Sequence, residues 1–414
     1  MSLWQLAWRS LWNRRASALL TLLTIAASVA LLLAVERVRV QARASFASTV
    51  SGTDLIVGAR GGSIQLLLYA IFGIGDAPQN FSWDSYEALR EHPDVAWTIP
   101  LALGDSYRGQ RVLATDHSYF EHYRYGGGQS LQLSQGHLLE SAQDAVLGAE
   151  VARQLNHGIG DSLVLSHGLG EVSFSDHKDA PFRVVGILAP TGTPVDRTVH
   201  IDLAGLQHMH RDWQHGVHIP GSGAHQDHAE EPALTAALLG LKSRTAALQL
   251  REQINRYAAE PLTAILPGFT LQQLWSLLGV AEQALRIVAL LVVLAGLLGM
   301  TATLVTSLGE RRREMAVLRA VGAAPRHIFG LLLAEALCLA LLASVTALAL
   351  FTAAVWLVAP YAQAQFGLLL PVSWPTPAEW GLLALVILAA GAAGLVPAVA
   401  AYRRSLADGL SLRL

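Results

Sequence analysis

Cysteine, lysine and charged residues in general are scarce in this 414-residue sequence. The one cysteine, Cys338, lies inside an apolar run, which excludes a disulfide framework and a cysteine-based zinc site. The two lysines, Lys178 and Lys242, do not follow a glycine-rich loop, so this chain cannot bind ATP through a P-loop. Charged residues make up 14% of the chain, against roughly 25% in soluble proteins. The shortfall indicates that part of the chain lies in lipid.

Signatures of catalysis are also missing. The sequence contains no G-x-S-x-G, no H-E-x-x-H and no G-x-G-x-x-G that opens a helix. The formal net charge is −2, so no global basic field points to nucleic acid as a partner. We therefore expect a chain that is not an enzyme and holds no cofactor of its own.

Four apolar segments are long enough to cross a bilayer, which requires about 20 residues. They cover residues 16–35, 284–308, 328–358 and 380–401. The first could also be read as a signal peptide, because Arg14 and Arg15 precede it. Its apolar stretch is longer than a signal peptide needs, and Glu36-Arg37-Val38-Arg39 is not a small-residue cleavage site. A retained membrane anchor is the favoured interpretation.

The arginines predict the orientation of these segments. They gather before the first segment, between the second and third, and after the fourth, while residues 359–379 contain no lysine or arginine. The positive-inside rule then places both termini and the 309–327 loop in the cytoplasm. Residues 36–283 must lie outside, and Trp374 and Trp380 fall where an interfacial aromatic belt is expected.

Residues 36–283, here called the outer domain, read as α/β with short elements. The pattern predicts helices at 82–91, 150–155 and 245–257, a turn at 158–161, and strands at 95–103, 162–165, 182–187 and 238–241. Ser82 is the expected N-cap of the first helix. The fold class is thus a membrane protein with four transmembrane helices and a large α/β extracytoplasmic domain between helices 1 and 2.

One apolar stretch of the outer domain, residues 64–74, is too short to span a membrane. It is either a buried core element or an interfacial or re-entrant hairpin close to the membrane. Glycines on both sides would permit a sharp bend.

The loop at 309–327 carries the most specific pattern in the chain. It reads ERRREMAVLRAVGAAPRH from Glu310, and residues 310–321 favour a helix. Met315, Leu318 and Gly322 would share one face of a short amphipathic helix on the inner membrane surface. Gly322 would end that helix in a left-handed conformation and Pro325 would start the next. A plain basic loop on anionic headgroups is the alternative.

The order of residues in this loop closely resembles the coupling-helix region of MacB/FtsX-type ABC exporter permeases. The resemblance extends over nearly the whole chain. It includes the start LAWRSLWNRRASALL, the segment Val146–Ala152 followed by Gly160-Asp161, the strand Phe182–Ile187, and Pro397 with the tail from Tyr402. The histidine-rich stretch 207–232 is not part of it.

The resemblance implies a permease of the bacterial cytoplasmic (inner) membrane that pairs with a second copy, as a homodimer, above two cytoplasmic ABC ATPase subunits. ATP and Mg²⁺ would bind those ATPases. The implied ATPase-coupling interface consists of Glu310, Arg311, Arg312, Arg313, Glu314, Leu318, Arg319 and Gly322. The large domain would be periplasmic, with an adaptor or substrate protein as a candidate partner there and lipids around the helices. Such systems transmit motion mechanically to outer domains.

Small residues in the spans, Gly296, Gly299, Gly391 and Gly394, would let helices approach closely. Glu335 is the one acidic or basic residue inside the third span. We expect it to pair with an arginine or to face the dimer interface, and the scarcity of other polar groups argues against a polar path through the bilayer.

Six histidines stand close together in the outer domain. They are His208, His210, His215, His218, His225 and His228, with acidic residues nearby. Imidazoles suit zinc and other transition metals, so a zinc site linked to metal homeostasis is one interpretation. A solvated loop of biased composition and a pH response near 6.5 are the others.

The sequence supports three hypotheses about function. The first is an ABC permease subunit that couples ATP hydrolysis to extracytoplasmic motion and to export or extraction of an unidentified substrate. The second is a membrane-anchored regulatory scaffold that activates an outer partner, and the third is a metal sensor. The expected division of the chain is 1–15 N-terminal segment, 16–35 helix 1, 36–283 outer domain, 284–308 helix 2, 309–327 coupling loop, 328–358 helix 3, 359–379 outer loop, 380–401 helix 4 and 402–414 tail.

Overall fold

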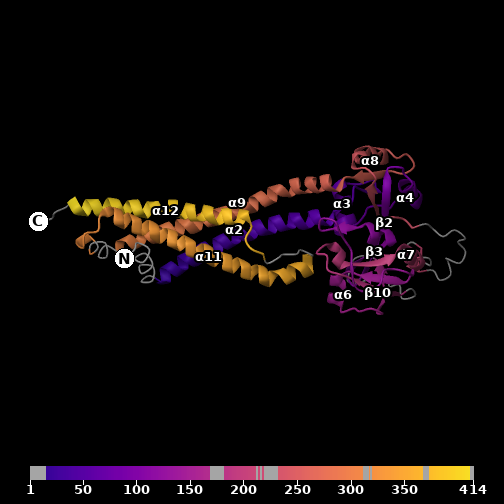
Figure 1. Cartoon of the computed structure of the whole chain (residues 1–414), viewed down its shortest axis with the longest axis horizontal. Coiled ribbons are helices and arrows are strands. Elements are labelled where there is room, and N and C mark those ends of the chain that lie inside the picture. The colour runs from indigo at the N-terminus through magenta and orange to yellow at the C-terminus, as the bar shows by residue number, and fades with distance from the viewer. Residues whose placement is uncertain are drawn as a thin grey trace. The chain divides into compact units, whose positions relative to one another are not determined.

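The computed structural model describes residues 15–167, 181–210, 213–214, 217–218, 232–310, 317, 319–366 and 373–410 (Figure 1). The chain divides into two compact units. The first, here called the helical unit, comprises Met1–Gln41, Gly279–Tyr361 and Leu370–Leu414. The second, here called the sheet unit, comprises Ala42–Leu278 and Ala362–Leu369. The expected N-terminal segment before Arg15 lies outside the described residues.

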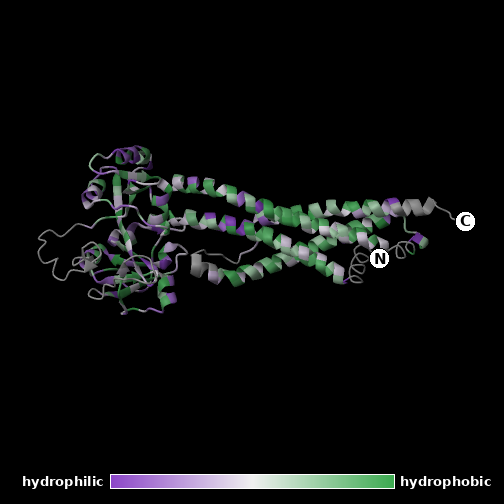
Figure 2. Cartoon of the chain, turned by 180° about the vertical axis from the view of Figure 1, so that it is seen from behind, coloured by the Kyte–Doolittle hydropathy of each residue, from purple (hydrophilic) through white to green (hydrophobic). Residues whose placement is uncertain are grey.

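Four long helices contain the four predicted spans. They are α2 (Arg15–Thr49), α9 (Pro267–Glu310), α11 (Pro325–Phe366) and α12 (Pro377–Leu410). Each is long and apolar enough to cross a membrane, and Figure 2 shows the hydrophobic residues that dominate them. The 44 residues of α9 extend over about 66 Å, whereas the hydrocarbon core is about 30 Å thick. The helices therefore continue well beyond the predicted spans.

A row of alanines places α11 in close contact with its neighbours in the helical unit. Ala336, Ala340, Ala343 and Ala347 recur every three or four residues and are each 0% exposed. A Cβ on Gly394 of α12 would lie 2.6 Å from the Ala336 Cβ, and one on Gly296 of α9 would lie 3.2 Å from the Ser28 Oγ of α2. Side chains of this size let the helix backbones approach one another.

The structure confirms the expected close approach at three of the four glycines. A Cβ on Gly391 would lie 3.3 Å from Leu337, so this position joins Gly296 and Gly394. The expectation for Gly299 is wrong, because nothing lies within 4 Å of its Cβ position. Glu335 is 2% exposed within the single chain. Its side chain is buried among the helices of its own copy.

The sheet unit is built on one mixed eleven-stranded sheet. Its main path runs β15-β1-β14-β2-β3-β11-β7-β10-β6, with β8 paired to β10 and β9 paired to β2. The strands are β1 (Leu55–Ala59), β2 (Val95–Tyr107), β3 (Gln110–Thr115), β6 (Leu133–Gly136), β7 (Asp144–Leu147), β8 (Ser162–Leu163), β9 (Ser166–His167), β10 (Phe182–Leu188), β11 (Thr198–Asp202), β14 (Ala236–Leu241) and β15 (Leu262–Ile265). Two short ribbons pair β4 (Arg124–Tyr125) with β5 (Gln129–Ser130) and β12 (Trp213–Gln214) with β13 (Val217–His218).

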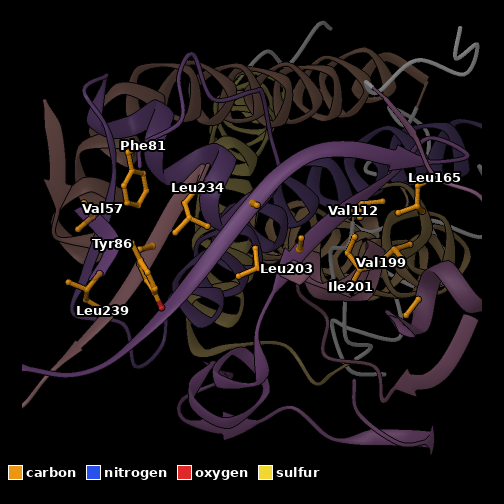
Figure 3. Packing of buried hydrophobic residues seen from close by; sticks show 14 of the residues in the cluster. Val57, Phe81, Tyr86, Val112, Leu165, Val199, Ile201, Leu203, Leu234 and Leu239 are labelled. Carbon is orange, nitrogen blue, oxygen red and sulfur yellow. The ribbon is translucent and has the colours of Figure 1, made fainter. Parts of the chain in front are cut away.

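Short helices cover both faces of this sheet. They are α3 (Ser63–Phe72), α4 (Trp83–Arg90), α5 (His117–His122), α6 (Ala149–Leu155), α7 (Leu203–His210) and α8 (Ala247–Asn255), with 3₁₀ turns η1 (Pro194–Arg197) and η3 (Arg244–Ala246). Strand β1 shows why both faces are apolar. Leu55 and Val57 belong to one core cluster (Figure 3), and Ile56 between them belongs to the other. A strand that is buried on both faces reads as a continuous apolar run.

The predicted elements of the outer domain are present with shifted ends. Helices α4, α6 and α8 and strands β2, β8, β10 and β14 match the expected segments, and the Ser82 side chain accepts a hydrogen bond from the Ser85 N–H as the N-cap of α4. Strands β1, β3, β7, β11 and β15 were not expected. β2 extends to Tyr107 with a register shift between Leu103 and Ser106.

The apolar stretch at 64–74 forms one helix, α3, and not a hairpin. Leu66, Leu67, Tyr69, Ile71 and Phe72 are buried, in the cluster that also contains Ile56 of β1. Gly73 ends the helix in the left-handed conformation, with φ +61°. The buried-core interpretation is therefore the right one, because the apolar face of α3 covers the sheet.

We predict that Gly148→Ala destabilises the sheet unit. Gly148 joins β7 to α6, and a Cβ there would lie 2.2 Å from the Val195 carbonyl oxygen. Overpacking of this kind costs about 1–3 kcal/mol. Unfolding of the full chain in detergent checks it. Gly158→Ala is the control, since nothing lies within 4 Å of its Cβ position, and equal destabilisation by both variants would contradict the prediction.

His200 should make the stability of the protein fall as the pH falls. The side chain is 0% exposed, its Nδ1 lies 3.2 Å from the Val146 carbonyl oxygen, and its Nε2 has no hydrogen-bond partner among the described residues. Burial disfavours the charged imidazole and lowers the pKa of His200 to about 4.

The unfolded chain takes up this proton near pH 6.5, before the folded chain does. The free energy of unfolding should therefore drop by about 3 kcal/mol between pH 6.5 and pH 4. His200→Phe should show a shallower decline when unfolding is followed across that window. An unchanged slope would rule out His200 as its source.

Candidate functional site

The two ends of the expected coupling loop are fixed by one small apolar cluster of the helical unit. Leu308 of α9, Ile328 and Leu332 of α11, and Ala398 and Ala401 of α12 are buried together. Three helices are thus joined where the loop leaves and returns. A displacement of the loop would act on α9, α11 and α12 at once.

The end of this loop has the predicted turn. The Val321 N–H donates to the Val317 carbonyl at 3.1 Å, and the Gly322 N–H donates to the Arg319 carbonyl at 2.9 Å. Gly322 has φ +96°, the left-handed conformation expected of a residue that ends a helix. Pro325 begins α11, as predicted, and the His327 Nδ1 accepts a hydrogen bond from the Ala324 N–H at 3.0 Å.

The expected coupling residues are only partly described. Glu310 is the last residue of α9, and Arg319 and Gly322 belong to the turn. Arg311, Arg312, Arg313, Glu314 and Leu318 lie outside the described residues, as does Met315. The structure adds two apolar side chains that the sequence analysis overlooked. Val317 and Val321 are 63% and 83% exposed, and their spacing places them on one helix face, free to contact another protein.

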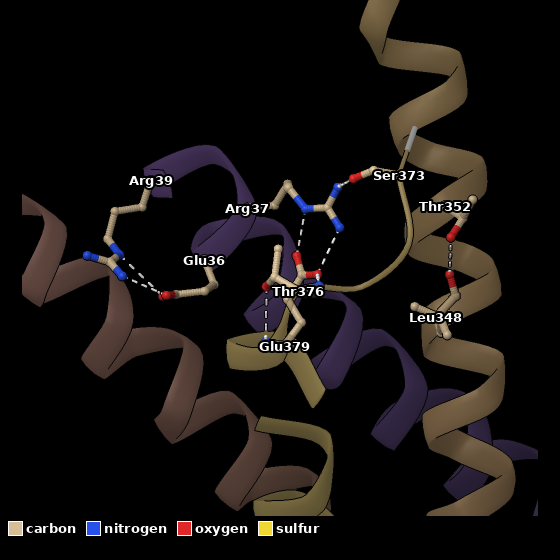
Figure 4. A network of polar contacts seen from close by, with 8 residues as sticks. All are labelled: Glu36, Arg37, Arg39, Leu348, Thr352, Ser373, Thr376 and Glu379. Atoms are coloured by element: carbon tan, nitrogen blue, oxygen red, sulfur yellow. Dashed lines mark hydrogen bonds and ion pairs between the residues drawn. The ribbon is translucent and has the colours of Figure 1, made fainter. Parts of the chain in front are cut away.

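A second polar site lies at the opposite end of the helices and was not predicted. It consists of Arg37, Phe351, Ser373, Thr376 and Glu379, here called the outer clamp. Figure 4 shows its polar residues, Arg37, Ser373, Thr376 and Glu379. The Arg37 Nε and Nη2 donate to the two carboxylate oxygens of Glu379 at 2.6 and 2.8 Å. Arg37 also donates from Nη1 to the Ser373 Oγ at 3.1 Å. Its guanidinium lies 5.4 Å from the centre of the Phe351 ring.

The sequence did contain a signal for this site. Thr376-Pro377-Ala378-Glu379 has the form of a capping box with proline at the first helical position. The Thr376 N–H donates to the Glu379 Oε2 at 2.7 Å, and the Glu379 N–H donates to the Thr376 Oγ1 at 3.3 Å. The same carboxylate therefore starts α12 and binds Arg37 of α2. A capping box predicts the first role but gives no indication of the distant arginine.

The other motifs that carry the family resemblance have structural roles in the sheet unit. Gly148 gives the Val195 carbonyl room to pack. The Asp161 carboxylate accepts from the Gly158 N–H at 3.0 Å, and its Oδ2 lies 2.9 Å from the His157 Nδ1. These two hydrogen bonds lower the pKa of Asp161. Phe182–Leu188 forms β10, parallel to β7.

Comparison with known families identifies both parts of the chain. The model for the MacB-like periplasmic core domain matches residues 18–257, which is more than half of the chain. The model for the FtsX-like permease C-terminal region matches residues 286–406. The chain belongs to the MacB/FtsX-like family of ABC permeases. It is therefore a multi-pass protein of the inner membrane, from a family of permeases that work with an ATPase partner.

Among solved structures, the chain is similar to the crystal structure of the periplasmic region of MacB from Actinobacillus actinomycetemcomitans. The two are 15% identical, with a TM-score of 0.33, and the match covers 55% of this chain and 94% of that one. No curated protein matches the sequence.

The histidine-rich stretch of this permease is described only in part. His208 and His210 belong to the end of α7, and His218 belongs to β13, where it pairs with Trp213. His215, His225 and His228 lie outside the described residues. Within the ranges that the structure describes, no three His, Cys, Asp or Glu side chains are grouped to hold a metal. Zinc binding by the six histidines stays a prediction.

We predict that Gly322→Ala opens the turn that ends the coupling loop. An L-residue in the left-handed region costs about 1–2 kcal/mol, which would raise the open population roughly 5- to 30-fold. Trypsin should therefore release the fragment ending at Arg319 faster from the variant in detergent. Gly309→Ala is the control, because Gly309 is helical and nothing lies within 4 Å of its Cβ position. Equal cleavage rates in wild type and Gly322→Ala would contradict this prediction.

Proposed function

We propose that this permease converts the nucleotide-driven motion of a separate cytoplasmic ATPase into movement of its own periplasmic domain. The observation that carries the proposal is the continuity of two helices. α2 runs unbroken from Arg15 to Thr49, and α9 runs unbroken from Pro267 to Glu310. Each helix begins in one compact unit and ends in the other. A helix whose backbone is hydrogen-bonded throughout carries displacement along its axis.

The ATPase end of this path is the coupling loop. Exposed Val317 and Val321 offer apolar contact, and the arginines from Arg311 to Arg313 offer charge. The cluster around Leu308 and Ile328 ties the loop to three helices. ATP and Mg²⁺ would act in the ATPase, and this chain would hydrolyse nothing itself. Both termini and the coupling loop would then be cytoplasmic.

The ends of α2 and α9 that belong to the sheet unit are packed within it by aromatic contacts. The Phe46 ring of α2 lies 4.4 Å from Phe72 of α3 and 5.5 Å from Trp275 of α9. Arg43 lies 5.5 Å from the centre of the Trp275 ring. The Tyr123 hydroxyl donates to the Thr49 carbonyl at 3.1 Å. Motion of either helix would therefore reach the sheet through packed side chains.

A second copy of the chain, arranged as a homodimer, would complete the assembly. The scarcity of polar side chains in the spans, where Glu335 is enclosed, favours transmitted motion over a polar path through the bilayer. Trp374 and Trp380, 89% and 51% exposed, suit the outer interface of the membrane. The substrate would then be one that is already outside the cytoplasm.

We expect Arg312→Glu and Val321→Asp to weaken association with the ATPase at least tenfold when the permease is purified from native membranes. The first variant reverses a charge in the coupling loop, and the second places a charge in an apolar contact. Arg403→Glu, in the tail on the same expected side, is the control.

Undiminished copurification of the ATPase with both variants would contradict the proposal. So would labelling that reaches Arg312→Cys from the periplasm alone, tested in a Cys338→Ala background.

A further inference from the structure

We propose that the outer clamp is the joint through which α11 and α12 move α2, with Arg37 as the positioning residue. This inference rests on the proposed function and names the contact that would carry its motion. α11 and α12 pack together beside the two ends of the coupling loop, in the cluster that contains Leu308, Ile328 and Ala398. α2 is the helix that continues to Thr49 in the sheet unit. A firm contact between α2 and these two helices would complete a path from the coupling loop to the outer domain.

Arg37 is positioned to make that contact. One guanidinium contacts Glu379 of α12, Phe351 of α11 and Ser373 in the segment before α12. Two parallel hydrogen bonds to one carboxylate fix both the distance and the angle between the groups. Glu379 is itself held by the Thr376 capping box. Any shift of the start of α12 therefore draws Arg37, and α2 with it.

The Arg37–Glu379 ion pair is expected to add little to the stability of the fold, so its role is to fix the position of α2. The side chains of Arg37 and Glu379 are 8% and 1% exposed. Removing two charges from water costs about as much as their attraction returns, and apolar replacements of such pairs are often neutral or stabilising. The core cluster of the helical unit is built largely from apolar side chains, with small residues such as Ala336 and Ala340. Because small apolar side chains allow sliding, the directional pair is what would fix the register of α2.

The same helix provides a matched control. Glu36 and Arg39, one residue before and two after Arg37, form an ion pair 2.6 Å long. Both residues belong to α2, three positions apart. Arg39 is also attracted by Glu282 of α9, so the control variant is Glu36→Gln, which removes the pair within α2 and leaves that attraction in place. Disrupting the Glu36–Arg39 pair in this way changes the same number of charges at the same level of α2.

The test uses the full chain with its partner ATPase in nanodiscs. Leu248 of α8 is 62% exposed, so Leu248→Cys in a Cys338→Ala background carries a spin label on the outer domain. The distance between labels on the two copies is measured without nucleotide and with ATP and vanadate. ATPase turnover is recorded on the same samples. The variants are Arg37→Gln, Glu379→Gln, the exchange Arg37→Glu with Glu379→Arg, the apolar pair Arg37→Met with Glu379→Leu, and the control Glu36→Gln.

We expect the nucleotide-dependent ratio of moved to resting states to fall roughly 2- to 30-fold in both single variants and in the apolar pair, the range over which coupling residues act. ATPase turnover should persist, the charge exchange should restore the movement, and Glu36→Gln should behave as wild type. The apolar pair keeps the test decisive if a single variant fails to fold.

Full movement in the apolar pair would overturn the inference while leaving the proposed function intact. So would equal loss of movement in Glu36→Gln. If the distance between the spin labels on the two wild-type copies does not change when ATP and vanadate are added, the proposed function is overturned, and this inference with it.

Discussion

The structure of this permease depends on one constraint, which is that backbone N–H and C=O groups in lipid must be satisfied within the chain. The constraint makes each span a helix. Such a helix continues past the membrane surface until the sequence contains residues that end it. After Val35 the residues Glu36 to Thr49 contain no glycine or proline, so α2 continues to Thr49. α9 likewise continues through Gly279, because a single glycine weakens a helix without ending it. As a result, α2 and α9 extend well beyond the predicted spans.

The membrane part could be predicted from the sequence because its signals are local. Apolar length gave four spans, and Gly322 and Pro325 gave the end of one helix and the start of the next. The lengths of the helices were underestimated, since hydropathy reports the lipid-facing stretch and not where the backbone hydrogen bonds stop. Gly299 was misjudged for a related reason. A glycine in a span permits close approach, but only the rotation of the helix decides whether a neighbour is there.

The sheet unit was harder to predict because its strands are short and buried on both faces. Leu55–Ala59 is apolar throughout, so it lacks the alternation that marks a strand with one exposed face. The outer clamp was missed for a different reason. Arg37 and Glu379 are 342 positions apart, and each has a local explanation, one as a charge that follows a span and the other as a helix cap. Only the fold shows that one carboxylate serves both.

The two kinds of contact within the helical unit have complementary mechanical properties. The alanine row from Ala336 to Ala347 gives a smooth seam with few protruding side chains, which lets the helix backbones approach closely and along which, in the proposed mechanism, neighbouring helices shift. The Arg37 pair is short, buried and directional, so it resists such shifts at one level of the bundle. If the helices could slide everywhere, a displacement that starts on the cytoplasmic side would not reach α2. If they were held together along their whole length, they would not move relative to one another. Helices that slide along most of their contact but are held together by the Arg37 pair at one level would transfer the displacement of α11 and α12 to α2.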